Sequence, residues 1–240
     1  MKDYEKLQEL IDESNNIVFF GGAGVSTESG IKDFRGKNGL YKMKQTNPNI
    51  TPEYMLSNRC LFDEPELFYD YYREYLDSRD IKPNVTHEYL AKLEDEGKLK
   101  AVVTQNIDGL HQKAGSKNIL EIHGTTMSNY CTKCKKDYPA DYIFESKGIP
   151  MCECGGMVRP DVVLYGEMLP AAFERAMAYI AQADMLIVAG TSLTVEPASS
   201  LVRLFNGKHL VIINNDKTPY DSLAELVIHK PLGEIFSKLK

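Results

Sequence analysis

Four of the five cysteines stand in two close pairs within one segment of the chain. Two residues separate Cys131 from Cys134, 17 residues follow, and one residue separates Cys152 from Cys154. Thiolates bind Zn²⁺ in a tetrahedron, and paired cysteines of this kind are typical of zinc ribbons. Four protein ligands leave no position open for water, so one structural zinc is expected. The second pair is a residue shorter than usual, and two unrelated cysteine pairs are the alternative.

A glycine-rich turn follows the apolar run 17–20. Its glycines would let backbone N–H groups approach a pyrophosphate, as in dinucleotide-binding loops. Thr27 replaces the third glycine of that fingerprint, so the motif is weak alone, and the glycines could simply tighten a turn. The polar run 26–35 that follows is typical of a lid over a cofactor. In it, Phe34 could cover a planar ring and Arg35 could hold a phosphate or ribose oxygen.

Polar side chains also follow the apolar run 101–103. Gln105, Asn106 and Asp108 suit hydrogen bonds to ribose hydroxyls and a carboxamide, although such residues also favour an ordinary turn after a strand. His123 is the best candidate for a general base, because a neutral imidazole can take a proton from a sugar hydroxyl near pH ~7. Taken alone, a single histidine is more often a packed or surface residue.

The elements that must position these residues can be read from short, β-branched apolar runs that end in turn or polar residues, at 17–20, 101–103, 185–189 and 210–213. Such runs indicate strands buried on both faces of a parallel sheet, with helix-like stretches at 86–96 and 173–182 between them. We expect an α/β fold, a Rossmann-like parallel sheet with helices on both faces. Ligands collect beyond the carboxyl ends of such strands, where several polar residues and a glycine stand: Gly22, Gln105, Asn106, Asp108, Thr191, Ser192 and Asn214.

Two stretches break this alternation and predict a smaller inserted module. Residues 47–80 are rich in tyrosine, phenylalanine and leucine and indicate a helical insertion, and 125–157 carry the cysteines and form a zinc-binding insertion. Residues 1–46, 81–124 and 158–240 would then form the Rossmann-like, dinucleotide-binding domain.

The chain has 240 residues and a formal net charge of −6. This charge opposes a sequence-independent grip on phosphate backbones, so no nucleic-acid partner is expected. No apolar run reaches the roughly 18 residues of a membrane span, and residues 1–13 indicate an amphipathic helix rather than a targeting segment. Five cysteines without a signal peptide point to a reducing compartment. We expect a cytoplasmic protein, a monomer, with no membrane partner.

Together these residues resemble the sirtuin family of NAD-dependent protein lysine deacylases, and most of all its small bacterial deacetylases. The resemblance rests on residues 22–35, 104–111, 121–124, the four cysteines, 159–167, 190–193 and 213–214, which span nearly the whole chain. It implies that NAD is consumed as a co-substrate, giving lysine, nicotinamide and O-acetyl-ADP-ribose. In this reaction the acyl oxygen attacks the ribose carbon, nicotinamide leaves, and His123 deprotonates a ribose hydroxyl.

The resemblance also assigns residues to roles. His123 and Asn106 would be catalytic. Acetyl-lysine proteins or peptides would bind as an added strand along Val163, Tyr165, Gly166 and Glu167, with Tyr165 beside the acyl-lysine tunnel. The NAD pocket would comprise Ala23, Thr27, Phe34, Arg35, Gln105, Ile107, Asp108, Thr191, Ser192, Asn214, Asn215 and Ile228. The zinc would bind Cys131, Cys134, Cys152 and Cys154.

Departures from the family pattern are few: Lys32 stands where proline is usual, and Tyr41 where tryptophan is common. Members that remove succinyl groups carry a Tyr-x-x-Arg pair in the helical insertion. This chain has Tyr72-x-x-Tyr75 in our alignment, which predicts deacetylation over desuccinylation. Two other functions stay open, a protein mono-ADP-ribosyltransferase and a non-enzymatic zinc-ribbon binding protein. A hydride-transferring oxidoreductase lacks support.

Overall fold

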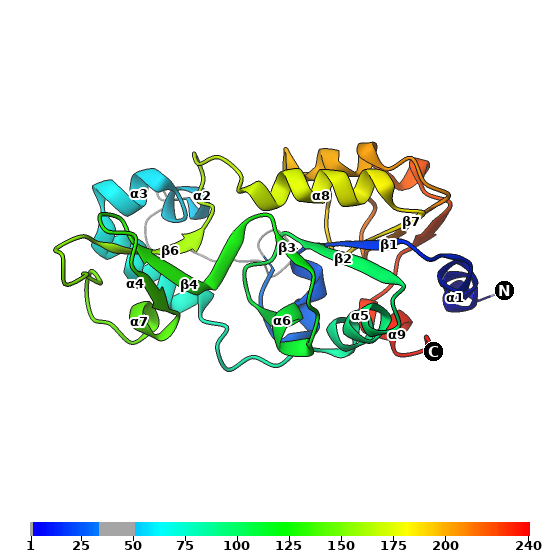
Figure 1. Ribbon diagram of the computed structural model, residues 1–240, viewed down its shortest axis with the longest axis horizontal. Helices are drawn as coiled ribbons and strands as arrows, with labels where there is room; N and C mark the ends of the chain where they lie inside the picture. The colour runs from blue at the N-terminus through cyan, green and yellow to red at the C-terminus, as the bar shows by residue number, and fades with distance from the viewer. Residues whose placement is uncertain (1, 34–50) are drawn as a thin grey trace.

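The computed structural model describes residues 2–33 and 51–240. Within this part of the chain, a six-stranded sheet occupies one end of an elongated molecule and a smaller sheet the other (Figure 1). Every strand pair in the larger sheet is parallel. Its strand order is β3 (Ile119–Glu121), β2 (Leu99–Thr104), β1 (Ile17–Gly21), β7 (Met185–Ala189), β8 (His209–Ile213) and β9 (Leu226–Ile228).

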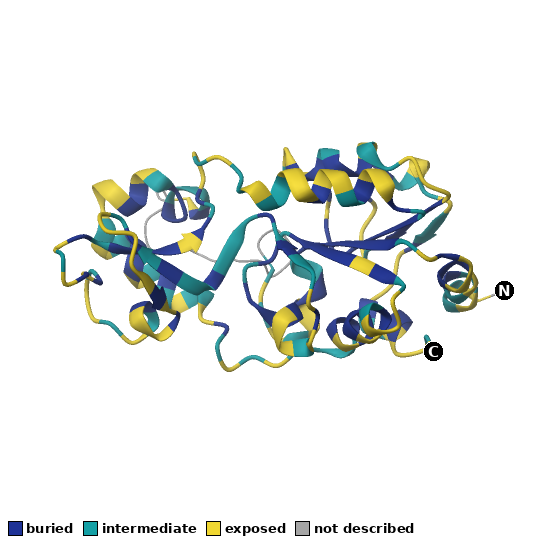
Figure 2. Ribbon diagram, in the orientation of Figure 1, coloured by how far each residue is buried: buried dark blue, intermediate teal, exposed yellow. Residues whose placement is uncertain are grey.

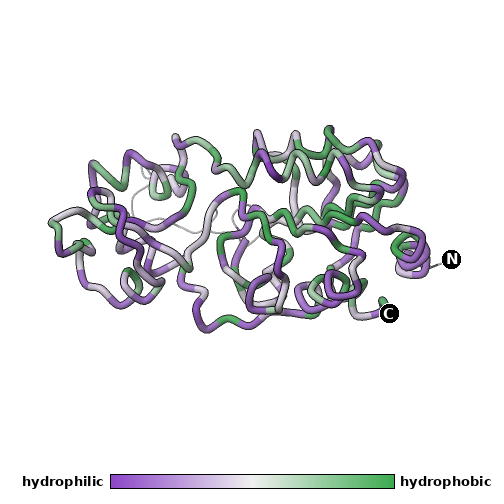
Figure 3. Tube along the Cα trace, viewed as in Figure 1, coloured by the Kyte–Doolittle hydropathy of each residue, from purple (hydrophilic) through white to green (hydrophobic). Residues whose placement is uncertain are grey.

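Helices cover both faces of this sheet, and successive strand residues point alternately to one face and the other. Phe19 and Ile187 pack with helices α1 (Asp3–Glu13), α5 (Val85–Asp95) and α9 (Leu232–Phe236). Phe20 and Val188 pack on the opposite face with α8 (Ala171–Gln182) and the 3₁₀ segment η4 (Ala198–Leu204). The strands β1, β7 and β8 are therefore buried along their whole length, and β2 has one exposed residue, Lys100. Figures 2 and 3 show this sheet as largely buried and hydrophobic.

The expected Rossmann-like sheet is confirmed, and all four predicted strand runs lie inside β1, β2, β7 and β8. The predicted helices 86–96 and 173–182 correspond to α5 and α8 within two residues at each end. The edge strands β3 and β9 have only three residues each, too few to give a recognisable periodic pattern.

The smaller sheet is antiparallel, with strand order β5 (Asp137–Pro139), β4 (Gly124–Cys131) and β6 (Val158–Val162). Three helices pack with it: α2 (Pro52–Met55), α3 (Asn58–Asp63) and α4 (Pro65–Leu76), and a short helix, α7 (Asp141–Phe144), lies beside β5. Phe68, Tyr69 and Tyr72 of α4 share one buried core with Cys131 and Val158. The helical segment and the cysteine segment are thus one packed body.

Local sequence explains where these helices begin. Thr51 and Ser57 accept hydrogen bonds from backbone N–H groups of α2 and α3, and Pro65 opens α4 at a position where its missing N–H costs nothing. Asn84 caps α5 in the same way. None of the helices in the described residues has the length and apolar character that crossing a bilayer demands.

Candidate active site and metal centre

Chain order reverses at β1, whose neighbours are β2 on one side and β7 on the other. Such a switch point opens a crevice beyond the carboxyl ends of the two strands, where parallel sheets bind ligands. The loops that follow β1 and β7 touch there, since Gly24 N–H donates to Gly190 O at 2.8 Å. A side chain on Gly24 would meet the Gly190 backbone at 2.7 Å. The glycine-rich turn is therefore needed for this close approach of two backbones.

Three polar side chains behind this turn form one hydrogen-bonded group. Ser26 Oγ donates to Asp108 Oδ2 at 2.6 Å, and Asn106 Nδ2 donates to Ser26 Oγ at 3.0 Å. The other Asp108 oxygen accepts the Leu110 N–H at 2.9 Å. Burial raises the pKa of Asp108, and the hydrogen bond from Ser26 partly opposes this. The group fixes Asn106 and Asp108 at the end of β2, pre-organised for a polar ligand.

His123 is held in one orientation by the backbone of Gln105, whose carbonyl oxygen lies 3.0 Å from Nδ1. A carbonyl oxygen can only accept, so Nδ1 carries the proton and Nε2 has a free lone pair. Burial lowers the pKa of His123, with a smaller opposing effect from this hydrogen bond. The imidazole is therefore neutral near pH ~7 and suited to accept a proton.

A cavity of about 500 Å³ joins the two ends of the molecule at this point. His123 and Asn106 line it. Residues beyond β1, β2, β7 and β8 form its polar end: Ala23, Thr27, Gln105, Thr191, Ser192, Asn214 and Asn215. Apolar side chains line the other end: Leu56, Tyr72, Leu76, Ile107, Val162 and Leu164. An adjoining cavity of about 450 Å³ shares Ala23, Asn106 and Ile107 and adds Ser26 and Asp108.

The structure thus brings together nearly all the predicted pocket residues that it describes. Ile228 is an exception, because it is buried in β9 and does not line either cavity; its carbonyl accepts the Asn214 N–H at 3.0 Å. Ile228 is therefore connected to the pocket through Asn214. Phe34 and Arg35 lie outside the described residues.

The expected peptide-binding residues Val163, Tyr165, Gly166 and Glu167 also line the main cavity. Val163 N–H donates to the carbonyl of His123 at 2.9 Å, which ties this segment to the candidate base. On the other side, Tyr165 N–H donates to Leu56 O and Asn58 N–H donates to Tyr165 O, each at 3.0 Å. The segment is therefore anchored to both the sheet end and the helical part.

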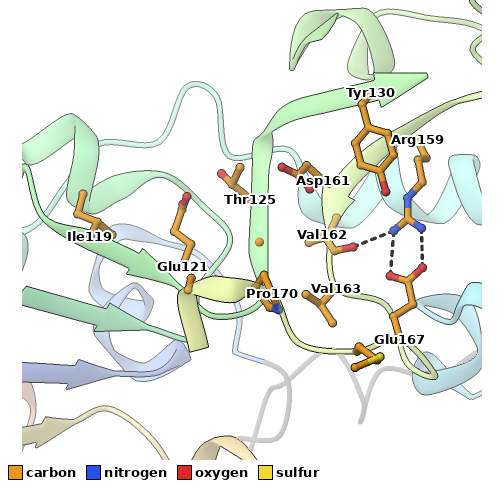
Figure 4. A pocket seen from close by; sticks show the side chains of 13 residues that line it. Ile119, Glu121, Thr125, Tyr130, Arg159, Asp161, Val162, Val163, Glu167 and Pro170 are labelled. Atoms are coloured by element: carbon orange, nitrogen blue, oxygen red, sulfur yellow. Dashed lines mark hydrogen bonds and ion pairs between the residues drawn. The ribbon is translucent and has the colours of Figure 1, made fainter. Parts of the chain in front are cut away.

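One ion pair fixes the shape of this segment, which we call the 163–167 segment. Arg159 donates to the two carboxylate oxygens of Glu167 at 2.5 and 3.0 Å and to Val162 O at 2.9 Å (Figure 4). Glu167 also accepts the Leu164 N–H at 2.9 Å and the Asn58 amide at 2.7 Å. The pair lies at the wall of a further cavity of about 590 Å³. Its geometry is bidentate, which gives the strongest form of this interaction.

The four cysteines of the predicted metal site do converge. Their Sγ atoms all lie within 4.8 Å of one another, and Cys131–Cys154 and Cys134–Cys152 are 3.5 and 3.6 Å apart. A tetrahedron with Zn–S bonds of ~2.3 Å places sulfurs about 3.8 Å apart, so the residues fit zinc. Tyr138 donates to Cys152 Sγ at 3.0 Å and lowers the pKa of Cys152 to about 6, which favours the thiolate. Bound here, zinc would hold the loops 131–134 and 152–154 together.

Sequence reasoning missed several residues of the site. The polar run 26–35 is predicted to form a lid, yet Ser26 in this run is buried and links Asn106 to Asp108. Val195, Glu196 and Pro197 line the main cavity and gave no signal beyond their place shortly after β7. A serine in a polar run can have many roles, so only its hydrogen bonds to Asn106 and Asp108 identify Ser26 as part of the site.

The molecule has a parallel sheet with an open switch point, and a cavity lined by His123 joins this sheet to the module that carries the four cysteines. These features define a Rossmann-like dinucleotide-binding enzyme with a zinc ribbon. The family model described as the Sir2 family matches residues 22–197, and the chain belongs to this family.

Close relatives and solved structures agree with this assignment. A protein of Clostridium perfringens named NAD-dependent protein deacetylase is 53% identical over 237 residues, covering 98% of this chain and 97% of its own. One of the same name from Staphylococcus aureus is 46% identical over 239 residues, covering 99% and 98%. A structure of Sir2 with a p53 peptide and NAD⁺ is 40% identical with a TM-score of 0.85, covering 99% and 97%. Another, with a deacetylated p53 peptide and 3′-O-acetyl-ADP-ribose, is 38% identical with a TM-score of 0.90, covering 98% and 96%.

Proposed function

We propose that this protein is an NAD-dependent protein lysine deacetylase that converts acetyl-lysine and NAD, with water, to lysine, nicotinamide and O-acetyl-ADP-ribose. One observation carries the proposal. A single cavity is lined at one end by the polar residues beyond β1, β2, β7 and β8, at the other by the 163–167 segment, and between them by His123. A dinucleotide and a modified peptide can therefore meet beside a neutral imidazole. The relatives named above as NAD-dependent protein deacetylases support this reading.

In this proposal the chain's own residues have separate tasks. Asn106, held by Ser26, and Gln105, held by Thr191, bind and orient the ribose next to nicotinamide. Asp108 and Ile107 hold the carboxamide, and Thr191, Ser192, Asn214 and Asn215 bind the phosphates and adenosine. His123 takes the proton of a ribose hydroxyl on Nε2 while Nδ1–H stays bonded to Gln105. The acyl oxygen has by then bonded to the ribose carbon in place of nicotinamide. The hydroxyl oxygen bonds to the acyl carbon, and the lysine nitrogen takes up a proton and leaves. Water then adds to the acyl carbon, so that the former acyl oxygen stays on the ribose as a hydroxyl.

The substrate would lie as an extended strand along Val163, Tyr165, Gly166 and Glu167. Backbone hydrogen bonds dominate such pairing, so it reads main chain more than side-chain sequence. That property suits an enzyme acting on acetyl-lysine in many sequence contexts. The structures with p53 peptides support a peptide partner. We also propose that the protein acts as a cytoplasmic monomer without a nucleic-acid partner, consistent with its net charge of −6.

The division into domains is likewise a proposal: a Rossmann-like domain of residues 1–46, 81–124 and 158–240, with insertions at 47–80 and 125–157. The pairing of β6 with β4 favours one change, because it would assign residues 158–162 to the zinc-binding insertion.

Mass analysis of the products tests the function. The zinc-loaded protein is incubated with NAD and an acetyl-lysine peptide, and we expect deacetylated peptide, nicotinamide and O-acetyl-ADP-ribose in equal amounts. NAD labelled in its ADP-ribose part separates the alternatives, because label that stays on protein would indicate ADP-ribosyl transfer. Absence of released nicotinamide from folded, metal-loaded protein would contradict the proposal.

A further inference from the structure

Two short 3₁₀ turns follow β1 and carry part of the proposed NAD pocket: η1 (Ala23–Val25) and η2 (Thr27–Ser29). Their first residues, Ala23 and Thr27, line the main cavity, and Ser26 between them belongs to the buried hydrogen-bonded group described above. A 3₁₀ turn of three residues has poor hydrogen-bond geometry and is weak on its own. The shape of residues 23–29, which we call the 23–29 turn, therefore depends on contacts with neighbouring elements.

Asn84, the residue before α5, contacts the end of each of these turns. Its side-chain amide donates one hydrogen bond to Val25 O at 2.8 Å and another to Ser29 Oγ at 2.9 Å. Val25 is the last residue of η1, and Ser29 is the last residue of η2. A single side chain thus fixes the two turns relative to each other, although it lies 59 and 55 positions away in the chain.

The same asparagine is fixed on its other side by α5. Asn84 Oδ1 accepts the Thr86 N–H at 3.0 Å, and the Asn84 N–H donates to His87 Nδ1 at 3.3 Å. Helix α5 packs on the sheet through Leu90 and Leu93, which belong to one of its two cores. The position of the amide is therefore set by a helix that the sheet core holds in place.

Helix capping alone does not explain an asparagine at this position. Serine, aspartate and asparagine cap helix N-termini about equally well, because each offers an oxygen that accepts a backbone N–H. Among these three residue types, asparagine alone adds an amide nitrogen with two hydrogens to donate. At Asn84 the oxygen serves the helix and both hydrogens serve the 23–29 turn, so this side chain joins the two.

We propose that Asn84 is a positioning residue for NAD, which keeps the 23–29 turn in the shape that binds the dinucleotide. The inference rests on the proposed function, because it takes the polar end of the main cavity as the NAD site. Asn84 does not line this cavity, so it acts on NAD through the turn. Without its two hydrogen bonds, NAD would have to order the turn as it binds, and this ordering lowers affinity. The peptide, which would lie along the 163–167 segment, should bind as before.

Asn84→Ser tests the proposal, because serine keeps an oxygen for the helix cap but lacks the two amide donors. We expect the KM for NAD to rise roughly three- to thirtyfold, the effect of one or two neutral hydrogen bonds. The KM for an acetyl-lysine peptide and kcat should each stay within about twofold of wild type, since neither depends on this turn in the proposal. Calorimetry should show the same loss of affinity for ADP-ribose, which needs no turnover.

Asn16→Ser is the matched control. Asn16 lies just before β1, at the opposite end of this strand from the 23–29 turn, and its amide donates to Gln182 O at 2.7 Å. The change removes the same kind of contact between two elements, but far from the cavity. The KM for NAD should therefore equal that of the wild type.

Ser29→Ala approaches the same contact from the turn. It should also raise the KM for NAD, and the double variant should show less than the product of the two separate effects, because both changes break one contact. An unchanged KM for NAD in Asn84→Ser, or an equal rise in the KM for the peptide, would overturn the inference. If Asn84→Ser does not fold, the same two outcomes are decisive in Ser29→Ala. Cleavage of an acetyl-lysine peptide by the wild type reports separately on the proposed function.

Discussion

At the scale of single residues, the tautomer of His123 decides what it can do. Its Nδ1–H is committed to Gln105, so the reactive lone pair is on Nε2. We expect His123→Ala to lower kcat by about 10²- to 10⁴-fold, the usual contribution of a general base. Burial lowers the pKa of His123 below its ordinary value of 6.5, so kcat/KM of the wild type should fall only at pH below that value. Circular dichroism of the variant supplies the control, because loss of fold would make the rate uninformative.

Single residues also decide whether the site accepts a charged acyl group. Tyr72 lines the apolar end of the main cavity, where the proposed function places the acyl group, and Tyr75 lines the adjoining cavity. The nearby Arg73 instead donates to Ile143 O and Ser146 Oγ. Lys32 lines the adjoining cavity, but no lysine or arginine of the described residues lines the main cavity, so a succinyl carboxylate beside Tyr72 would be buried there without a cation, a cost of several kcal/mol. We expect kcat/KM for a succinyl-lysine peptide at least about 100-fold below that for its acetyl counterpart. Comparable rates for the two peptides would contradict this expectation and would show that a cation reaches the acyl group.

At the scale of elements, the Arg159–Glu167 pair fixes the 163–167 segment against β6 and α3. Glu167 accepts hydrogen bonds from Arg159, Leu164 and Asn58, so Glu167→Gln leaves the buried Arg159 without its counter-charge. We expect the peptide KM to rise about tenfold with a smaller change in kcat, since the segment orients the peptide rather than the reacting atoms. Glu174→Gln, an exposed position on α8, is the matched control and should behave as wild type. A fall in kcat at unchanged KM would place Glu167 in the chemistry instead.

Element patterns also explain how far sequence alone could lead. The apolar runs of β1, β2, β7 and β8 are buried on both faces of the sheet, so the sequence predicts these strands, and their carboxyl ends locate most of the site. The cysteine spacing located the metal cluster because sulfur ligands must converge. By contrast, Ser26 acquires its place in the site from hydrogen bonds to residues 80 or more positions away in the chain. Such contacts leave no local pattern, and the same holds for the Ile228 carbonyl, which accepts the Asn214 N–H.

At the scale of the whole molecule, two buried histidines make stability depend on pH. Burial lowers the pKa of His87 to about 4 and of His111 to about 3, from an ordinary 6.5. Between pH 6.5 and these lower pKa values, the two histidines bind protons in the unfolded chain but not in the folded chain. The free energy of unfolding should therefore fall as pH falls. The slope approaches about 1.4 kcal/mol per pH unit for each histidine. Urea unfolding at several pH values measures it, and His111→Leu should flatten the curve; an unchanged slope in that variant would contradict this account.

The two ends of the molecule have separate cores, which predicts an uneven response to metal removal. The cysteine cluster shares its core with α4, whereas the two cores of the large sheet contain none of its residues. Stripping zinc should therefore unfold the smaller part first and leave the sheet folded. The apo-protein should lose peptide binding and deacetylation, because the 163–167 segment is anchored to Leu56 and Asn58, but should keep much of its affinity for ADP-ribose.

Calorimetry with each ligand measures the two affinities, and added zinc should restore activity. Cys60→Ala is the control: Cys60 lies outside the cluster, so this variant should retain one zinc per chain. Equal loss of peptide and ADP-ribose binding would mean that the two cores unfold as one.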